Sequence, residues 1–346
     1  MKTFIRIFLV LSLFILPVNA AEFTAPTVPN SAEKYMPDHS DSFAGGIWEM
    51  VEKTLELLEP SVIEATQICL SLIAISLVLG VAEKISPATN NVTDVVGVLL
   101  IGLIVLQRTD SFIQLGAETV KQLSDYCNLL LPVISGALAA QGAVTTSSVL
   151  YAGTVLFNAV LSTVITRFVV PLLYVFAVMS IVDHAVGSGL LTDICKFIKW
   201  LMIWILKLTI YVFTGYLTVS GVISGSTDAA ALRATKLAIS GVVPVVGGII
   251  SDASESILVS AGLMKSAAGL YGFFATLAIW IGPFVKIGIQ YLMLKITGAI
   301  CGAAGAKQPT LLIQQITSIM GIVVATTVTM MVLILISIIC ILKGSA

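Results

Sequence analysis

The chain has 346 residues, of which 58% are hydrophobic and 11% are charged, and its net charge is −1. An ordinary soluble domain is about 45–50% apolar and about 25% charged. A soluble enzyme is therefore excluded, because 18 basic and 19 acidic side chains cannot supply a wetted surface for this chain. The near-neutral charge gives no field to hold nucleic acid. We expect a lipid bilayer around most of the chain and no nucleic-acid partner.

The N-terminus has the pattern of a secretory signal peptide over residues 1–21. Two basic residues precede a short apolar run over 7–16, and small residues follow it. This order predicts cleavage near Ala20 or Ala21. The alternative is an uncleaved first transmembrane helix, for which the apolar run is short. A cleaved peptide places the mature N-terminus outside the cytoplasm.

Residues 22–60 form an acidic extracytoplasmic leader, with eight acidic and two basic residues and hence a local charge of −6. Its first part is rich in proline, which argues against packed structure. Its second part predicts an amphipathic helix that ends at Pro60. The acidic face of this helix consists of Glu49, Glu52, Glu56 and Glu59, and the apolar face of Ile47, Val51, Leu55 and Leu58.

Two roles are open for this leader helix. It can rest its apolar face on the membrane or on the protein's own extracytoplasmic surface. It can also be a docking helix for a protein partner, which its acidic face favours, because anionic lipid attracts acidic residues poorly.

Residues 61–346 form the predicted multipass membrane domain. Charge-free stretches of about 18 residues or more are candidates for spanning helices. Counting two passes in the longest stretch, we predict an all-α, polytopic membrane protein with about seven or eight transmembrane helices, at 62–82, 95–107, 126–166, 168–181, 200–223, 266–285 and 321–342. The charged segment 110–125 is expected to lie along the membrane interface as an amphipathic helix.

The segment 224–262 predicts a helix, a break and a second helix. Its halves are too short or too charged to span a membrane, so we expect a broken or re-entrant hairpin. Its charged residues are Asp228, Arg233, Lys236, Asp252 and Glu255, and its break residues are Gly241, Pro244, Gly247 and Gly248. The charges either neutralise each other across the hairpin, or line a water-filled path or bind a partner.

The sequence contains no recognisable catalytic machinery. Its two histidines are far apart, its five cysteines form no CxxC pair, and no phosphate-binding loop or nucleophile motif is complete. We therefore expect no catalytic residues, no metal and no cofactor.

The signal peptide, the acidic leader, the multispan body and above all STDAAALRATKLAISGVVPVVGGIISDASESILVSAG resemble the stage III sporulation protein AE family. The resemblance implies a non-enzymatic subunit in the mother-cell membrane that surrounds the forespore. There it would work with the other stage III sporulation proteins, AA to AH, and a forespore-side channel protein in a transenvelope channel or secretion-like complex required after engulfment. The alternative is a self-sufficient secondary transporter that uses the broken helix 224–262. A transporter of this kind is expected to repeat that pattern, and no second copy is evident.

A charge-reversal experiment in the native sporulating host separates the two interpretations of the hairpin. Arg233 and Lys236 are replaced by Glu, Asp252 and Glu255 by Lys, and then all four together. If the charges neutralise each other, each half-reversal abolishes accumulation in the membrane, and the combined variant restores both protein and spores. If they meet a partner or a permeant, the half-reversed proteins accumulate, spores are lost, and the combined variant does not rescue them.

Overall fold

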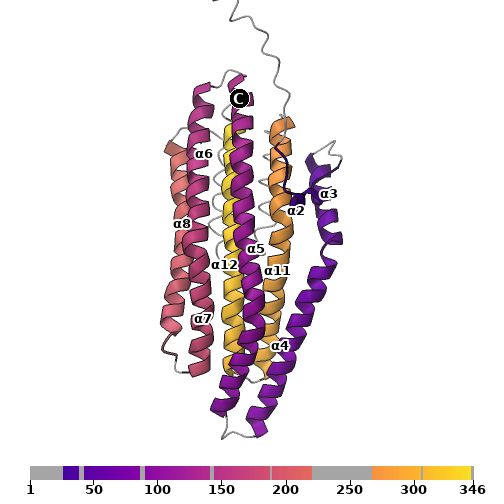
Figure 1. The fold of residues 1–346 in the computed structure, drawn as a ribbon, viewed down its shortest axis with the longest axis vertical. Coiled ribbons are helices and arrows are strands. Elements are labelled where there is room, and N and C mark those ends of the chain that lie inside the picture. Colours follow the sequence, from indigo (N-terminus) through magenta and orange to yellow (C-terminus); the bar gives the residue numbers. More distant parts are fainter. Residues whose placement is uncertain are drawn as a thin grey trace, which may run out of the picture.

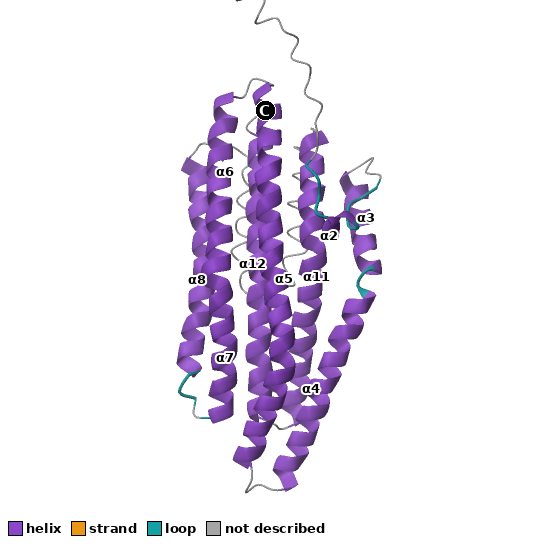
Figure 2. Ribbon diagram, viewed as in Figure 1, coloured by secondary structure: helices purple, strands orange, loops and turns teal. Residues whose placement is uncertain are grey.

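The computed structural model describes residues 26–38, 43–85, 90–140, 144–187, 189–219, 267–304 and 307–343. Every regular element in these ranges is helical (Figure 2). The predicted all-α class is therefore confirmed for this part of the chain. The predicted signal peptide with Ala20 and Ala21 and the helix–break–helix segment 224–262 lie outside the described residues and stay predictions.

Two short helices of the leader precede a bundle of long helices. The leader helices are α2 (Asn30–Glu33) and α3 (Phe43–Glu56). The long helices run up and down side by side in an elongated bundle (Figure 1), in the order α4 (Glu59–Ile85), α5 (Asn90–Ala140), α6 (Val144–Val164), the π-helical turn η2 (Ile165–Val169), α7 (Val170–Val186), α8 (Thr192–Val219), α11 (Ala267–Ala304) and α12 (Lys307–Lys343).

Six helices of the described chain are long and apolar enough to cross a membrane. This count differs from the seven or eight expected, because stretches that charges separate in the sequence are joined in the structure. The stretch 95–107 and the start of 126–166 belong to one helix, α5. The stretch 168–181 lies in η2 and α7, which follow α6 without a break and form one long helix with it. In the described residues, the domain is therefore a bundle of six long apolar helices.

The expectation for the segment 110–125 was wrong. It forms the middle of α5 instead of a separate helix along the interface. Asp110 accepts a hydrogen bond from the hydroxyl of Tyr174 on α7 at 2.7 Å. Just before the segment, Arg108 forms an ion pair with Glu64 on α4. Partners on two other helices thus satisfy charges that would be unfavourable if they were left unpaired at membrane depth.

Helix α12 lies at the centre of the bundle and packs against α11, α5, α7, α6 and α8. Of the residues in its most apolar stretch, 72% are buried within the protein, against 28% for α8. Its buried hydroxyl groups donate to carbonyls of their own helix, as Thr317 does to Ile313 at 2.8 Å and Ser337 to Leu333 at 2.7 Å. An apolar core can therefore contain these polar side chains without unpaired donors.

Glycine allows α5 to approach this central helix closely. A Cβ atom built on Gly116 would lie 2.5 Å from Cγ1 of Val323 on α12. Val323 is buried, and its β-branched side chain has little rotational freedom to move aside. Contact between α5 and α12 at this level thus depends on the missing side chain.

We predict that Gly116→Ala lowers the thermal unfolding temperature of the purified protein in detergent, because overpacking of a core costs about 1–3 kcal/mol. The matched control is Gly136→Ala on the same helix, where an added Cβ meets nothing within 4 Å. That control should be neutral or more stable, by about 0.5–1 kcal/mol, through helix propensity. Equal unfolding temperatures for the two variants would contradict the close approach.

Candidate functional site

Most residues singled out in the sequence lie outside the described part of the chain. These are Asp228, Arg233, Lys236, Asp252 and Glu255, with the break residues Gly241, Pro244, Gly247 and Gly248. Their roles stay predictions. The leader helices, in contrast, are described, and they contain the predicted acidic docking face.

One side of the leader packs on the start of α11. The ring of Phe43 lies 5.1 Å from that of Phe273, centroid to centroid, and Gly46 lies directly against the ring of Phe274. Tyr35 is buried against Gly282, where an added Cβ would lie 2.5 Å from its ring. The leader is therefore anchored on the bundle by aromatic rings that meet glycines.

The structure has a helix, α3, where the amphipathic helix is predicted, but a different side of it packs on the protein. The buried residues of α3 are Gly46, Met50 and Thr54. Val51 and Leu55, placed by the prediction on the face that rests on the membrane or on the protein itself, do not pack on the protein, and 62% of Leu55 is accessible to solvent. The reason is the close approach of α11, which only a small residue such as Gly46 allows.

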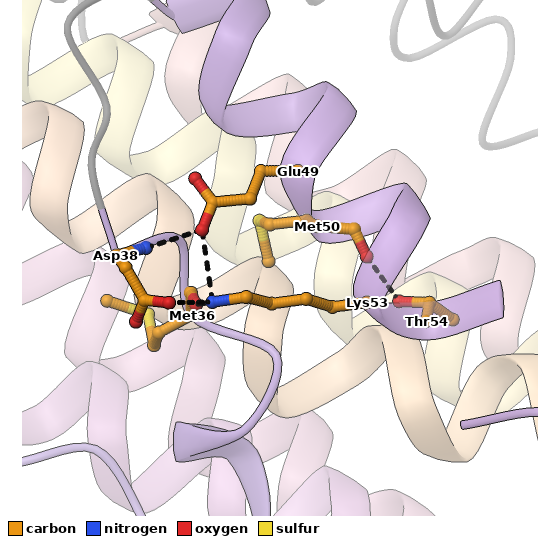
Figure 3. Close-up of polar contacts among 6 residues, drawn as sticks. All are labelled: Met36, Asp38, Glu49, Met50, Lys53 and Thr54. Carbon is orange, nitrogen blue, oxygen red and sulfur yellow. Dashed lines mark hydrogen bonds and ion pairs between the residues drawn. The ribbon is translucent and has the colours of Figure 1, made fainter. Parts of the chain in front are cut away.

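Lys53 connects α3 to residues 36–38, the end of the α2 segment (residues 26–38, which contain α2) (Figure 3). Its Nζ donates to the carbonyl of Met36 at 2.7 Å and lies 2.8 Å from Oδ2 of Asp38 and 3.0 Å from Oε1 of Glu49. The backbone N–H of Asp38 donates to the same Glu49 oxygen at 2.7 Å. One ammonium and two carboxylates thus form a closed cluster that fixes the angle between the leader segments.

The electrostatics of this cluster favour the charged lysine. Partial burial lowers the pKa of Lys53, but the hydrogen bonds and negative charges of Asp38 and Glu49 outweigh it. The pKa of Lys53 in the folded protein therefore lies above its ordinary value. A raised lysine pKa stabilises the folded state at every pH below the ordinary lysine value, and this stabilisation is lost as the pH rises through the folded pKa.

The predicted docking face divides into two parts. Glu49 turns inward into the Lys53 cluster, whereas Glu52, Glu56 and Glu59 are exposed. The prediction that Pro60 ends the leader helix was wrong. Helix α3 ends at Glu56, and Pro60 is the second residue of α4, where its missing N–H leaves no helical bond unmade.

Beside the exposed carboxylates, α3 presents an apolar stripe to solvent. Trp48, Val51 and Leu55 are separated by three and four residues, which places them on one face of the helix. Trp48 is 71% exposed. The outer side of α3 therefore combines three apolar residues with a row of carboxylates, and we call it the α3 outer face.

Sequence reasoning missed the Lys53 cluster and the polar contacts within the bundle. The four-residue spacing from Glu49 to Lys53 indicates part of the Lys53 cluster, because side chains at i and i+4 meet on a helix. The Arg108 contact with Glu64 joins residues 44 positions apart, and the Tyr174 contact with Asp110 joins residues 64 apart. No local pattern indicates such pairs. Within the described residues, no three His, Cys, Asp or Glu side chains come together as metal ligands.

We predict that Lys53→Met loosens the leader, because it leaves the carboxylates of Asp38 and Glu49 without their cation. Limited proteolysis of the full chain should cut residues 26–56 faster, with a loss of about 1 kcal/mol in local stability, typical of a partly exposed ion pair. The control is Lys34→Met, which removes an equal charge from an exposed lysine that lies over the Tyr35 ring.

The same cluster predicts a pH dependence. Protection of the leader should be constant through neutral pH and should fall above about pH 10.4, the ordinary lysine value. The fall should be absent in Lys53→Met, because that variant has no ammonium to lose at this position. An equal fall in both proteins would contradict the role given to Lys53.

Comparisons with known proteins agree on one family. The family model described as stage III sporulation protein AE matches residues 31–344. A protein named stage III sporulation protein AE from Bacillus subtilis (strain 168) is 22% identical over 193 residues, which cover 56% of this chain and 48% of the relative. The matched part thus spans about half the relative's length. No solved structure matches the chain significantly. Since the family model covers nearly all of the chain, the protein belongs to the stage III sporulation protein AE family.

Proposed function

We propose that this protein is a non-enzymatic subunit of a transenvelope channel or secretion-like complex, in the mother-cell membrane around the forespore. Its family supports a role in sporulation, and its six long apolar helices support a membrane location. The complex would contain other stage III sporulation proteins, AA to AH, and a forespore-side channel protein, and would act after engulfment.

The observation that carries the proposal is the α3 outer face. The opposite side of α3 is packed against α11, so the helix is held rigidly with Trp48, Val51 and Leu55 exposed. Tryptophan is enriched among the residues that dominate binding energy at protein interfaces. A fixed, exposed stripe of this kind is suited to a protein partner.

Charge identifies the chemistry of that partner. Glu52 and Glu56 border the apolar stripe on α3, Glu59 follows at the start of α4, and carboxylates are repelled by anionic lipid. The occupant we propose is another subunit that presents an apolar stripe edged by lysine or arginine. Opposite charges around an apolar centre would set the orientation and the rate of docking.

We predict that Trp48→Ala with Leu55→Ala leaves membrane accumulation unchanged but reduces spore formation about ten-fold or more, because losing an anchor of at least about 2 kcal/mol weakens binding by more than ten-fold. Co-purification of the other stage III sporulation proteins should fall in parallel. The matched control is Leu77→Ala with Val78→Ala on α4, an equally exposed apolar pair.

The charge of the face is tested in the same host. Glu52→Lys with Glu56→Lys should also accumulate and should also lose spores. The proposal is wrong if both leader variants accumulate, co-purify with the other subunits and form spores like the wild type.

A further inference from the structure

One exposed face of α5 is polar over residues 111–128. Its exposed residues recur at spacings of three and four, which places them in one straight row: Ser111, Gln114, Glu118, Lys121, Asp125 and Asn128. We call this row the α5 stripe. At about 1.5 Å per residue it is about 25 Å long, close to the about 30 Å thickness of the hydrocarbon core of a bilayer.

Contacts between helices show which parts of α6 and α8 lie level with the α5 stripe. The side chain of Asn158 on α6 donates to the backbone carbonyl of Ser124 on α5 at 3.2 Å. The rings of Phe157 on α6 and Phe213 on α8 lie 5.3 Å apart. These contacts align α6 and α8 with the upper part of the α5 stripe.

The surface of α6 and α8 at this height is apolar. Leu156 is 61% exposed and Val212 is 51% exposed, and Val160 and Tyr211 are exposed beside them. In Figure 1, α6 and α8 lie on one side of α5, and α11 and α4 lie on the other. At this height the bundle thus exposes both an apolar surface, on α6 and α8, and a charged row, on α5.

A single copy of the chain in a bilayer would expose both the apolar surface and the charged row to lipid. Lipid surrounds a lone membrane protein in every direction, and an unpaired charged side chain at the centre of a bilayer is unfavourable. The α5 stripe carries three charged side chains, of which Glu118 accepts a hydrogen bond from Gln122 at 3.1 Å. That one local bond does not replace the hydration of a charged row.

We infer that the α5 stripe faces water at a depth where α6 and α8 face lipid, and so lines an aqueous passage. The inference rests on the proposed function, because the passage would be enclosed by other subunits. Water fits the stripe better than a protein partner does. The row contains hydroxyl, amide and both charge signs but no aromatic or large apolar side chain that could anchor a partner, in contrast to the α3 outer face.

Cysteine labelling in native membranes tests this inference on the full chain. Single cysteines replace Glu118, Lys121 and Asp125 on the stripe, and Leu156, Val160 and Val212 on the apolar side at the same height. N-ethylmaleimide is applied to the membranes, and thiols left unreacted are counted after denaturation with a polyethylene-glycol maleimide. The unaltered chain gives the background from its own cysteines, four of which are buried in the described residues.

We expect the stripe cysteines to react about ten-fold faster or more than the apolar controls, because the thiolate that attacks maleimide forms only in contact with water. Ser111→Cys, which changes the side chain least, should react like the other stripe cysteines even if a charged-site variant fails to fold. Stripe cysteines as unreactive as the controls, or controls as reactive as the stripe, would overturn the inference. Neither result depends on spore counts, so failure here is distinct from failure of the leader variants.

Discussion

Close contact between helix backbones is the constraint on which the rest of the bundle depends. Lipid tails are as apolar as leucine, so burial alone does not drive membrane helices together, and tight packing must do so. Helix α12 provides the common partner, and glycine lets its neighbours approach, as Gly116 does at Val323. The long helices elsewhere approach in the same way, with Gly272 of α11 against Leu130 of α5. Polar groups inside this packing have no water, so each must find a partner within the protein.

The need of buried polar groups for partners within the protein explains why the helices were easier to predict than the residues at which they end. Apolar length indicated helical spans correctly at 62–82, 200–223 and 321–342, in the parts that the structure describes. The charges between two apolar stretches predict a break that α5 does not have. Arg108 and Asp110 lie inside this helix, where Arg108 forms an ion pair with Glu64 and Asp110 accepts a hydrogen bond from Tyr174. A contact between residues tens of positions apart leaves no mark on local periodicity, so the continuity of α5 could not be predicted.

The buried face of the leader helix could not be predicted, for a different reason. The helix itself and the exposure of three of its four predicted acidic residues were predictable from spacing alone. Its buried face was not, because a hydrophobicity pattern ranks Val51 and Leu55 above Gly46. The structure reverses that order, since Phe274 can approach α3 only where a side chain is missing. The residues displaced from the contact are those that form the α3 outer face.

The α3 outer face and the α5 stripe are connected through α2. The hydroxyl of Ser31, in α2, lies 3.5 Å from Oε1 of Gln122, which borders the α5 stripe. Lys53 fixes α3 relative to the α2 segment. A partner bound on the α3 outer face would therefore contact a helix that is linked through α2 to the helix with the stripe. In the proposed complex, the leader would align neighbouring subunits with the α5 stripe. A charged helix face would be unfavourable in a lone copy in the bilayer, and assembly would make it acceptable.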